Sequence, residues 1–233
     1  MDDNQREQNK IIRKKRIMKV FIEVAEQIIA EEGIGAVTTR KVAERAGYNS
    51  TSLYHYFDDL DHLIFLACLG TLDDYNATGP EYLEGCKNSV ERYFRINERY
   101  FYFAYGNPQV FQQLFFTDRD NSKERYTDQY YDLFPERETA SLEQLARIAR
   151  TSNLASRNAI LLRPCVEDGY ITQEAAREFN EMSLMIYKCI LDEAVAGHLT
   201  REEAMDKSMR FYRRLLFSCI RAEYRTLVGE LEQ

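Results

Sequence analysis

Apolar residues recur at helical spacing along most of this chain of 233 residues. From about residue 10 to Glu32 they form one stripe, which Gly33 ends and which contains Ile17, Val20, Phe21, Val24, Ile28 and Ile29. This spacing predicts an amphipathic helix with one buried face. Alternating β-branched runs bounded by turn residues are absent, and the chain has only 4 prolines and 10 glycines. The pattern therefore predicts an all-α protein.

Capping and turn residues divide the rest of the chain into further helices. The pattern predicts helical stretches over about 58–75, 81–105, 110–116, 141–167, 172–196 and 200–228. Ser141 with Gln144, and Thr200 with Glu203, have the spacing of capping boxes. The polar segment 118–138 is expected to be mostly a variable connection that is helical only in part.

Residues 38–57, TTRKVAERAGYNSTSLYHYF, contain two short helical patterns around an alanine-glycine turn. Thr38 or Thr39 can cap the first helix, Gly47 allows a sharp helix exit, and Asn49 can cap the second. The second pattern is rich in hydroxyl groups and hydrogen-bonding rings, which can donate to phosphates or contact base edges. This is a DNA-binding helix-turn-helix pattern. Its candidate DNA contacts are Thr38, Thr39, Arg40, Asn49, Ser50, Thr51, Ser52, Tyr54, His55 and Tyr56.

Residues from Arg13 to about Leu66 resemble the N-terminal domain of the tetracycline-repressor (TetR) family of bacterial transcription factors. The resemblance rests on a basic first helix, the stretch EEGIGAVTTRKVAERAG and the signature LYHYF. It implies a three-helix DNA-binding domain over 1–57 and a helical ligand-binding and dimerisation domain over 58–233. The sequence departs from the family pattern at Lys41, Asn49, Thr51 and Leu60. At Leu60 the family usually has a phosphate-contacting lysine, and the acids around it should weaken non-specific affinity for DNA.

The net charge of −7 is unevenly distributed along the chain. Residues 1–57 hold ten Lys or Arg against eight Asp or Glu, a net charge of +2, whereas residues 58–233 hold 21 against 30, a net charge of −9. Within Lys10–Lys19 six of ten residues are basic and none is acidic. Such a run is usually a solvated helix face, but its position ahead of the helix-turn-helix predicts a helix that lies beside a phosphate backbone.

Catalytic and metal-binding patterns are absent from the sequence. The five cysteines are odd in number and widely spaced, so four or five of them are expected to be small apolar core residues, with redox sensing as the alternative. They are Cys68, Cys86, Cys165, Cys189 and Cys219. The three histidines are scattered, and no Ser/His/Asp arrangement or glycine-rich phosphate loop is present. We therefore expect no enzyme, no metal and no cofactor.

The chain has no stretch of about 18 uninterrupted apolar residues, and its first residues, MDDNQREQNK, are polar rather than signal-like. We therefore expect a cytoplasmic protein that makes no membrane contact.

The last two predicted helices carry apolar arcs that are wider than one intramolecular contact needs. The first arc contains Met182, Met185, Ile186, Cys189, Ile190 and Ala194, and the second contains Met205, Met209, Tyr212, Leu215, Leu216, Cys219, Ile220 and Leu227. In TetR-like proteins two such helices pair with their symmetry mates, which implies a homodimer. The alternative is that both arcs close the core of a monomer.

Aromatic residues concentrate between the helix-turn-helix and these last helices. Most are expected to fill core volume, but Asn97 interrupts the apolar stripe that Phe94 and Phe101 continue, and a buried amide needs a partner. Either Asn97 bonds to a neighbouring helix or water, or it orients a ligand in an aromatic pocket. The predicted ligand-binding residues are Tyr93, Asn97, Phe101, Phe111 and Phe115.

These features favour a dimeric repressor that binds double-stranded operator DNA and is released by an aromatic or amphipathic small-molecule effector. An activator, or a regulator without an effector, is the alternative within the same class. A helical small-molecule carrier or enzyme would also need an aromatic cavity, but it would need neither the basic first helix nor the hydroxyl-rich helix.

Overall fold

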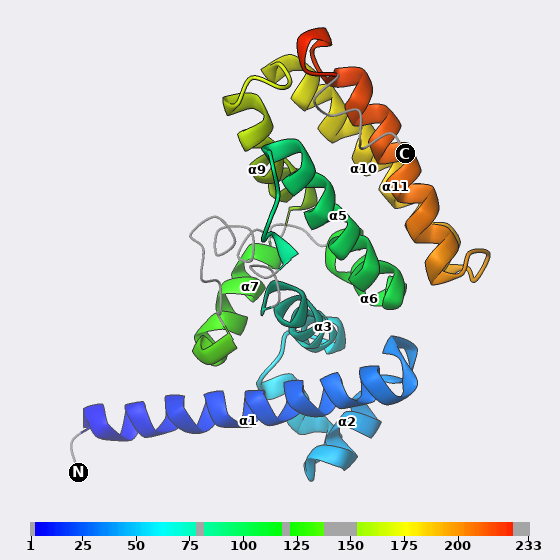
Figure 1. Ribbon diagram of the computed structural model, residues 1–233. Helices are drawn as coiled ribbons and strands as arrows, with labels where there is room; N and C mark the ends of the chain where they lie inside the picture. The colour runs from blue at the N-terminus through cyan, green and yellow to red at the C-terminus, as the bar shows by residue number, and fades with distance from the viewer. Residues whose placement is uncertain (1–2, 78–81, 118–121, 138–152, 226–233) are drawn as a thin grey trace. The chain divides into compact units, whose positions relative to one another are not determined.

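The computed structural model describes residues 3–77, 82–117, 122–137 and 153–225 (Figure 1). Every regular element in these ranges is a helix, which confirms the predicted all-α class. The elements are α1 (Asp3–Glu32), η1 (Ile34–Ala36), α2 (Thr39–Ala46), η2 (Ser50–His55), α3 (Leu60–Ala77), α5 (Ser89–Gly106), α6 (Pro108–Phe115), α7 (Ser122–Leu133), η3 (Pro135–Arg137), α9 (Leu154–Glu167), α10 (Gln173–Val195), α11 (Arg201–Cys219) and η4 (Ala222–Tyr224).

The helices form two compact units. The first contains the described residues up to Asp73 together with α7 and η3, and the second contains the end of α3, α5, α6, α9, α10, α11 and η4. The first unit therefore extends past residue 57, where the DNA-binding domain was expected to end, and it includes a helix from much later in the chain.

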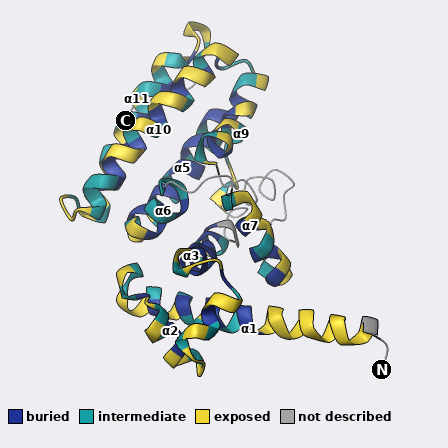
Figure 2. Ribbon diagram, turned by 180° about the vertical axis from the view of Figure 1, so that it is seen from behind, coloured by how far each residue is buried: buried dark blue, intermediate teal, exposed yellow. Residues whose placement is uncertain are grey.

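The core of the first unit is built on one face of α1. Phe21, Ile22 and Ile28 are fully buried on α1, together with Val42 of α2 and Leu53 of η2. α1 is longer than expected, because it begins at Asp3 rather than near residue 10. Its added N-terminal turns are exposed, as the yellow ribbon in Figure 2 shows.

The segment 118–138 was expected to be mostly irregular, and this expectation was wrong for its described part. Residues 122–133 form α7, whose Tyr126, Tyr130 and Tyr131 are buried in the first unit. The spacing of Tyr126, Tyr130, Tyr131 and Phe134 indicates a helix in part, but the many charged residues around them favoured an irregular connection. The helix is stabilised by packing against residues that lie far away in the chain.

The second unit buries a cluster of aromatic rings among α5, α10 and α11. Phe101 of α5 is fully buried, and its ring meets that of Tyr212 of α11 edge-on at a centroid distance of 4.9 Å. Phe179 and Tyr187 of α10 are also buried in this cluster. Tyrosine and phenylalanine therefore supply the large core volume in a chain with no tryptophan.

Three predicted helix ends in the second unit need correction. α5 begins at Ser89 rather than near 81, because Gly85 has a φ of 77° and the side chain of Asn88 caps the helix. α9 begins at Leu154 with Asn153 as its cap, and the predicted Ser141/Gln144 capping box lies outside the described residues. α11 ends at Cys219 rather than near 228.

The last helix ends early for a tertiary reason. Ile220 has extended backbone angles and a buried side chain, and the backbone N–H of Arg221 donates to the carbonyl of Tyr170 at 3.0 Å. At its other end, the predicted capping box of Thr200 and Glu203 is present.

Candidate nucleic-acid interface and internal cavity

Three local hydrogen-bonding devices fix the turn between α2 and η2. The Thr38 hydroxyl accepts from the backbone N–H of Lys41 at 3.2 Å and caps α2. Gly47 has a φ of 74°, and the N–H of Tyr48 donates back to the carbonyl of Ala43 at 2.8 Å, which closes the end of α2. The side-chain Oδ1 of Asn49 accepts from the backbone N–H of Thr51 at 3.1 Å and caps η2. The two predicted caps and the glycine turn are confirmed.

The second element of the motif is a 3-10 helix rather than an α-helix. η2 covers Ser50–His55, and Leu53 and Phe57 anchor it in the core. Tyr56 lies just beyond η2, half-buried, with its ring centroid 6.0 Å from that of Phe21. Of the aromatic residues predicted to contact DNA, Tyr56 therefore packs inward, whereas Tyr54 and His55 are exposed.

The predicted DNA contacts from both elements come together on one unit. The side chain of Tyr54 is 58% exposed, and its hydroxyl lies 3.4 Å from that of Thr39. This contact joins η2 to the first turn of α2. Thr38, Arg40, Asn49, Thr51 and His55 are exposed, and Thr39, Ser50 and Ser52 are half-buried. The group presents hydroxyl, amide and guanidinium donors to the outside, which is the chemistry that phosphates and base edges bind.

Ion pairs neutralise several charges around this surface. Lys41 pairs with Glu32 at 2.6 Å, and Arg45 pairs with Glu31 at 2.6 Å and with Glu32 at 2.8 Å. The hydrogen bond from Lys41 lowers the pKa of Glu32. By contrast, no ion pair forms on Arg40 within the described part of the chain.

The two acids that follow the motif, Asp58 and Asp59, also have hydrogen-bond or ion-pair partners. Asp58 accepts from the Tyr126 hydroxyl at 2.8 Å and pairs with Arg125 at 2.6 Å. The hydrogen bond from Tyr126 is the main cause that lowers the pKa of Asp58. Asp59 accepts from the backbone N–H of His62 at 2.6 Å and caps α3. Because Arg125 offsets the charge of Asp58, that carboxylate repels DNA less than the sequence suggested.

Residues far apart in the sequence determine how α7 packs within this unit. The ring of His62 in α3 stacks on that of Tyr126 with centroids 3.7 Å apart, and its Nε2 lies 2.9 Å from Oε1 of Gln129. The backbone N–H of Asp58 donates to His62 Nδ1 at 3.2 Å. An accepting Nδ1 and a donating Nε2 describe a neutral ring, and burial lowers the pKa of His62. Two of these partners, Tyr126 and Gln129, lie more than 60 residues from His62 in the sequence, so no local pattern predicts them.

A second cluster joins α1, α3, α7 and η3 in the same unit. Arg137 donates to Glu26 at 2.6 Å and to the Tyr130 hydroxyl at 2.7 Å, and Tyr130 donates to Asp73 at 2.6 Å. Burial raises the pKa of Asp73 to about 6. A Cβ at Gly70 would lie 2.6 Å from Glu26 Oε1, so glycine leaves the space for this cluster.

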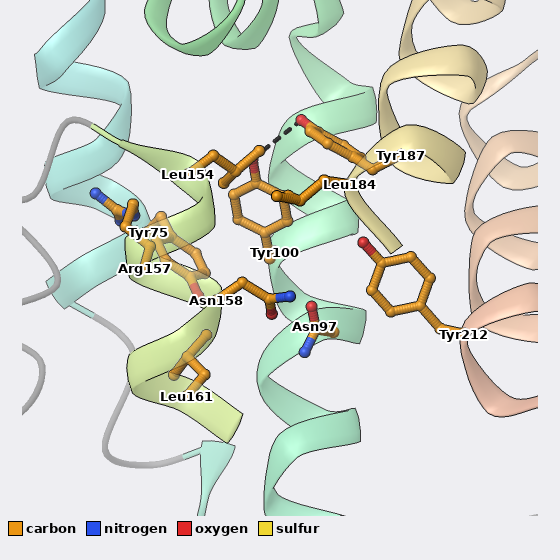
Figure 3. A pocket seen from close by; sticks show the side chains of 10 residues that line it. All are labelled: Tyr75, Asn97, Tyr100, Leu154, Arg157, Asn158, Leu161, Leu184, Tyr187 and Tyr212. Atoms are coloured by element: carbon orange, nitrogen blue, oxygen red, sulfur yellow. Dashed lines mark hydrogen bonds between the residues drawn. The ribbon is translucent and has the colours of Figure 1, made fainter. Parts of the chain in front are cut away.

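The second unit contains an internal cavity among α5, α9, α10 and α11 (Figure 3). The room open to the centre of a water molecule is about 30 Å³, which is enough for about two ordered waters. The cavity is lined by Tyr75, Asn97, Tyr100, Leu154, Arg157, Asn158, Leu161, Leu184, Tyr187 and Tyr212. Aromatic and aliphatic side chains and a few polar groups thus line a small, partly open space.

Hydrogen bonds fix most polar groups around the cavity. The Tyr100 hydroxyl donates to that of Tyr187 at 3.0 Å (Figure 3). Asn158 accepts from Tyr93 at 2.8 Å and donates to Asn180 at 2.8 Å. The Tyr212 hydroxyl donates to the carbonyl of Ser183 at 2.9 Å. Burial is the main cause that raises the pKa of both Tyr100 and Tyr187.

Asn97 has features of both predicted roles, because it forms a hydrogen bond within the protein and also lines the cavity. Its Nδ2 donates to the carbonyl of Tyr93, one turn earlier in α5, at 2.8 Å. The amide also lines the cavity, with its oxygen on the side opposite that bond (Figure 3). The other predicted ligand residues, Tyr93, Phe101, Phe111 and Phe115, lie in the surrounding aromatic core and are not among the described lining residues. The cavity residues on α9 and α10 were not predicted from the sequence.

The arcs on the last two helices divide into a buried part and an exposed part. Ile190, Met209, Tyr212, Leu216 and Ile220 are buried within the chain. Met182 and Met185 are 41% and 64% exposed, Cys189 is exposed, and Ile186 is half-buried. These four residues share one face of α10, and we call them the α10 face. Leu227 lies outside the described residues.

The cysteines are less uniformly buried than expected. Cys68 and Cys165 are buried, whereas Cys86 and Cys219 are intermediate and Cys189 is exposed. No group of three His, Cys, Asp or Glu side chains that could hold a metal ion occurs among the described residues. Within those same ranges, no helix is both long enough and apolar enough to cross a membrane.

Comparison with known proteins connects the first unit to a family. Residues 21–66 match the model of the bacterial regulatory proteins of the tetR family. The chain is 32% identical over 72 residues to the HTH-type transcriptional regulator HbdR of Aromatoleum sp. (strain CIB), which is 31% of each protein. It is 40% identical over 54 residues to the HTH-type transcriptional repressor KstR2 of Rhodococcus jostii (strain RHA1), which is 23% of this chain and 26% of that protein. These matches span about a third or less of either relative.

Two solved structures share the fold at low sequence identity. One is described as a TetR-family transcription regulator of Shewanella sp. PV-4, with 15% identity, a TM-score of 0.50, and coverage of 88% of this chain and 97% of that one. The other, from Mesorhizobium loti MAFF303099 and described in the same way, has 13% identity, a TM-score of 0.51, and coverage of 88% and 96%. At this identity the likeness concerns the fold.

Proposed function

The N-terminal domain of this chain belongs to the TetR family of bacterial regulatory proteins, and from that premise we propose that the chain is a sequence-specific DNA-binding transcriptional regulator. The observation that carries the proposal is the exposed donor surface built by α2 and η2, with Tyr54 held against Thr39. Residues 1–57 would supply the DNA contacts, and residues 58–233 would supply ligand binding and dimerisation. The family match favours a regulator over an enzyme or a small-molecule carrier.

Repression relieved by a small molecule is the mode of action that we propose. The matched protein of Rhodococcus jostii is named a repressor, which supports the sign of the regulation. The cavity beside Asn97 supports an aromatic or amphipathic effector, because aromatic walls and a few oriented polar groups are typical of ligand pockets. Since the cavity is small as it stands, an effector would favour a state in which α5, α9 and α10 lie further apart, and this preference would drive release from DNA.

The active form in this proposal is a homodimer that pairs through the last two helices. The exposed apolar α10 face supports the pairing. A single η2 contacts few bases, so two copies placed about 34–36 Å apart on successive major grooves would supply the specificity. A regulator that binds double-stranded DNA acts where that DNA is, so the proposal includes a cytoplasmic location for this chain.

The test is DNA binding by two single variants. Tyr54→Ala removes an exposed ring and hydroxyl of η2, and Arg40→Ala removes a cation at the start of α2. In a gel-shift assay with the DNA upstream of the chain's own gene, both variants should bind more weakly than wild type, with unchanged circular dichroism. Arg40→Ala should also lower the slope of log affinity against log salt by about one. Unchanged binding by both folded variants would rule out this surface as the DNA site.

A further inference from the structure

The first turns of α1 extend beyond the packed part of the first unit. Ile17 is the first buried residue of the helix, and residues 5–16 are all exposed (Figure 2). We call residues 5–16 the α1 extension. The twelve residues of the extension span about 18 Å along the helix at 1.5 Å per residue. A projection of this size has no role in the core that α1 forms with α2 and η2.

The α1 extension is strongly basic. Its only acid is Glu7, and its six basic residues are Arg6, Lys10, Arg13, Lys14, Lys15 and Arg16. Lys10 pairs with Glu7 at 3.2 Å, and Lys15 Nζ lies 3.5 Å from the carbonyl of Asp132. No ion pair is formed by Arg13, Lys14 or Arg16 within the described ranges.

Basic residues elsewhere in the same unit behave differently. Lys19, Lys41, Arg45, Arg125 and Arg137 all form ion pairs with carboxylates of the unit. Arg40, which lies at the predicted DNA surface, forms none in the described structure. Described cations of this unit that form no ion pair therefore include Arg13, Lys14 and Arg16 on the α1 extension and Arg40 at the start of α2.

The composition of the α1 extension indicates which polyanion it fits. Ile11 and Ile12 are its only apolar residues, and they are 51% and 64% exposed. Adjacent residues point about 100° apart on a helix, so this pair forms no continuous apolar stripe. A membrane-bound helix or a helix that pairs with a second copy needs such a stripe. Duplex DNA needs only cations on a rigid support, because it carries one negative charge per 1.7 Å or so along its axis.

We propose that the α1 extension forms a second DNA contact, on phosphates that flank the bases recognised through η2. The inference rests on the proposed function, since α1 is the helix against which α2 and η2 pack. Arg13, Lys14 and Arg16 bind the flanking backbone and add affinity without adding base specificity. The contact lengthens the stretch of duplex that each subunit occupies, so full affinity requires DNA beyond the recognised bases.

The experiment compares two duplexes and two triple variants. One duplex contains only the bases protected most strongly in a footprint of the upstream DNA, and the other adds about ten base pairs on each side. The test variant is Arg13→Gln, Lys14→Gln, Arg16→Gln. The matched control is Arg163→Gln, Arg177→Gln, Arg214→Gln, which removes three exposed cations from the second unit. Fluorescence anisotropy gives the affinity of each at several salt concentrations.

On the long duplex the test variant should lower the slope of log affinity against log salt by about two to three, while the control leaves it unchanged. On the short duplex, wild type and test variant should have nearly equal slopes. Equal slopes for wild type and test variant on the long duplex would overturn the inference. A difference in sedimenting mass between wild type and an Ile11→Ser, Ile12→Ser variant would also overturn the inference, because it would show that the extension takes part in self-association. Absence of DNA binding by wild type would refute the proposed function itself, and the inference with it.

Discussion

Three individual residues determine the geometry of the helix-turn-helix. Thr38 and Asn49 satisfy N–H groups that the starts of α2 and η2 leave without partners, and Gly47 takes a left-handed conformation between them. The two caps and the glycine conformation depend on neighbouring residues, so all three could be predicted from the sequence. This turn places the Tyr54 side chain of η2 next to Thr39. Small changes of the backbone in the turn should therefore affect DNA binding as well as stability.

The left-handed conformation of Gly47 gives a prediction with an internal control. A Cβ at Gly47 would meet no atom within 4 Å, so the cost of Gly47→Ala is backbone strain alone, about 1 kcal/mol in the free energy of unfolding. Gly35→Ala also adds a Cβ in open space, but at a residue whose φ is not left-handed. It should leave stability unchanged or raise it slightly. Urea denaturation of both variants tests this, and equal effects would contradict the argument.

Asn97 gives the second prediction at this scale. Asn97→Leu keeps most of the side-chain volume but removes the amide oxygen from the cavity wall. If that oxygen orients an effector, the variant should bind operator normally and need at least ten times more effector for release. The effector for this test is any aromatic or amphipathic compound that raises the melting temperature of the wild type and releases it from DNA. Equal effector sensitivity in variant and wild type would show that the amide is structural.

Among the helices, α7 is the one whose role in the first unit differs most from the sequence prediction. It supplies Tyr126 and Gln129 to His62, Arg125 to Asp58, and Tyr130 to Asp73. These contacts hold α3 directly after the DNA-binding motif. The first unit is therefore completed by α7, which begins at Ser122, well after the first part of the unit ends at Asp73.

The neutral state of His62 predicts how acid affects this unit. Burial lowers the pKa of His62 below its ordinary value of 6.5, so on acidification the unfolded chain takes up a proton before the folded one. Stability should therefore fall as pH drops below about 6.5. Around the ring, Asp58 and Asp59 favour protonation and Arg125 opposes it. The raised pKa of Asp73 acts in the opposite direction, because stability from that group increases as pH falls from about 6 towards 4.

A His62→Gln variant isolates this contribution. The difference in unfolding free energy between wild type and variant should shrink as pH falls from 7 to 5, since the contribution of Asp73 is common to both. The control is His198→Gln, which changes a histidine whose side chain is 67% exposed. A constant difference between wild type and His62→Gln over this pH range would contradict the account.

The all-helical class and most helix starts could be predicted because their causes are local. The Thr200/Glu203 capping box and the Thr172 cap at the start of α10 depend on residues three positions apart or fewer. The end of α11 and the existence of α7 could not be predicted in this way. One depends on the contact of Arg221 with Tyr170, and the other on rings that pack against α1 and α3 residues far away. Similarly, Asn97 was found as an interruption of an apolar stripe, whereas Arg157 and Asn158 of the cavity follow no comparable pattern.

For the whole molecule, only residues that are exposed on the single chain can form the proposed dimer interface. The sequence suggested Leu216 and Ile186 together as interface positions. Leu216 is fully buried within the chain, so a charge there should unfold the protein rather than separate two folded subunits. Met185 and Ile186 belong to the α10 face and are better positions for the test.

The Met185→Lys, Ile186→Lys variant should remain helical and sediment near 27.5 kDa, whereas wild type should sediment at twice that mass. Cys189 offers an independent probe, because it is exposed on the same face of the single chain. Its thiol should react slowly with a labelling reagent in the wild type and rapidly in the double variant. A wild-type monomer that binds DNA with full affinity would contradict the dimer.

The central claim is that this chain recognises a particular DNA sequence, and a competition titration tests it most directly. Wild-type protein is bound at physiological salt to a labelled duplex from upstream of its own gene, and is then displaced by unlabelled duplex of either the same or a scrambled sequence. The account predicts that the scrambled duplex competes at least 10³-fold less well, as is usual for specific regulators. Equal competition by the two duplexes, with the protein folded and dimeric, would contradict it.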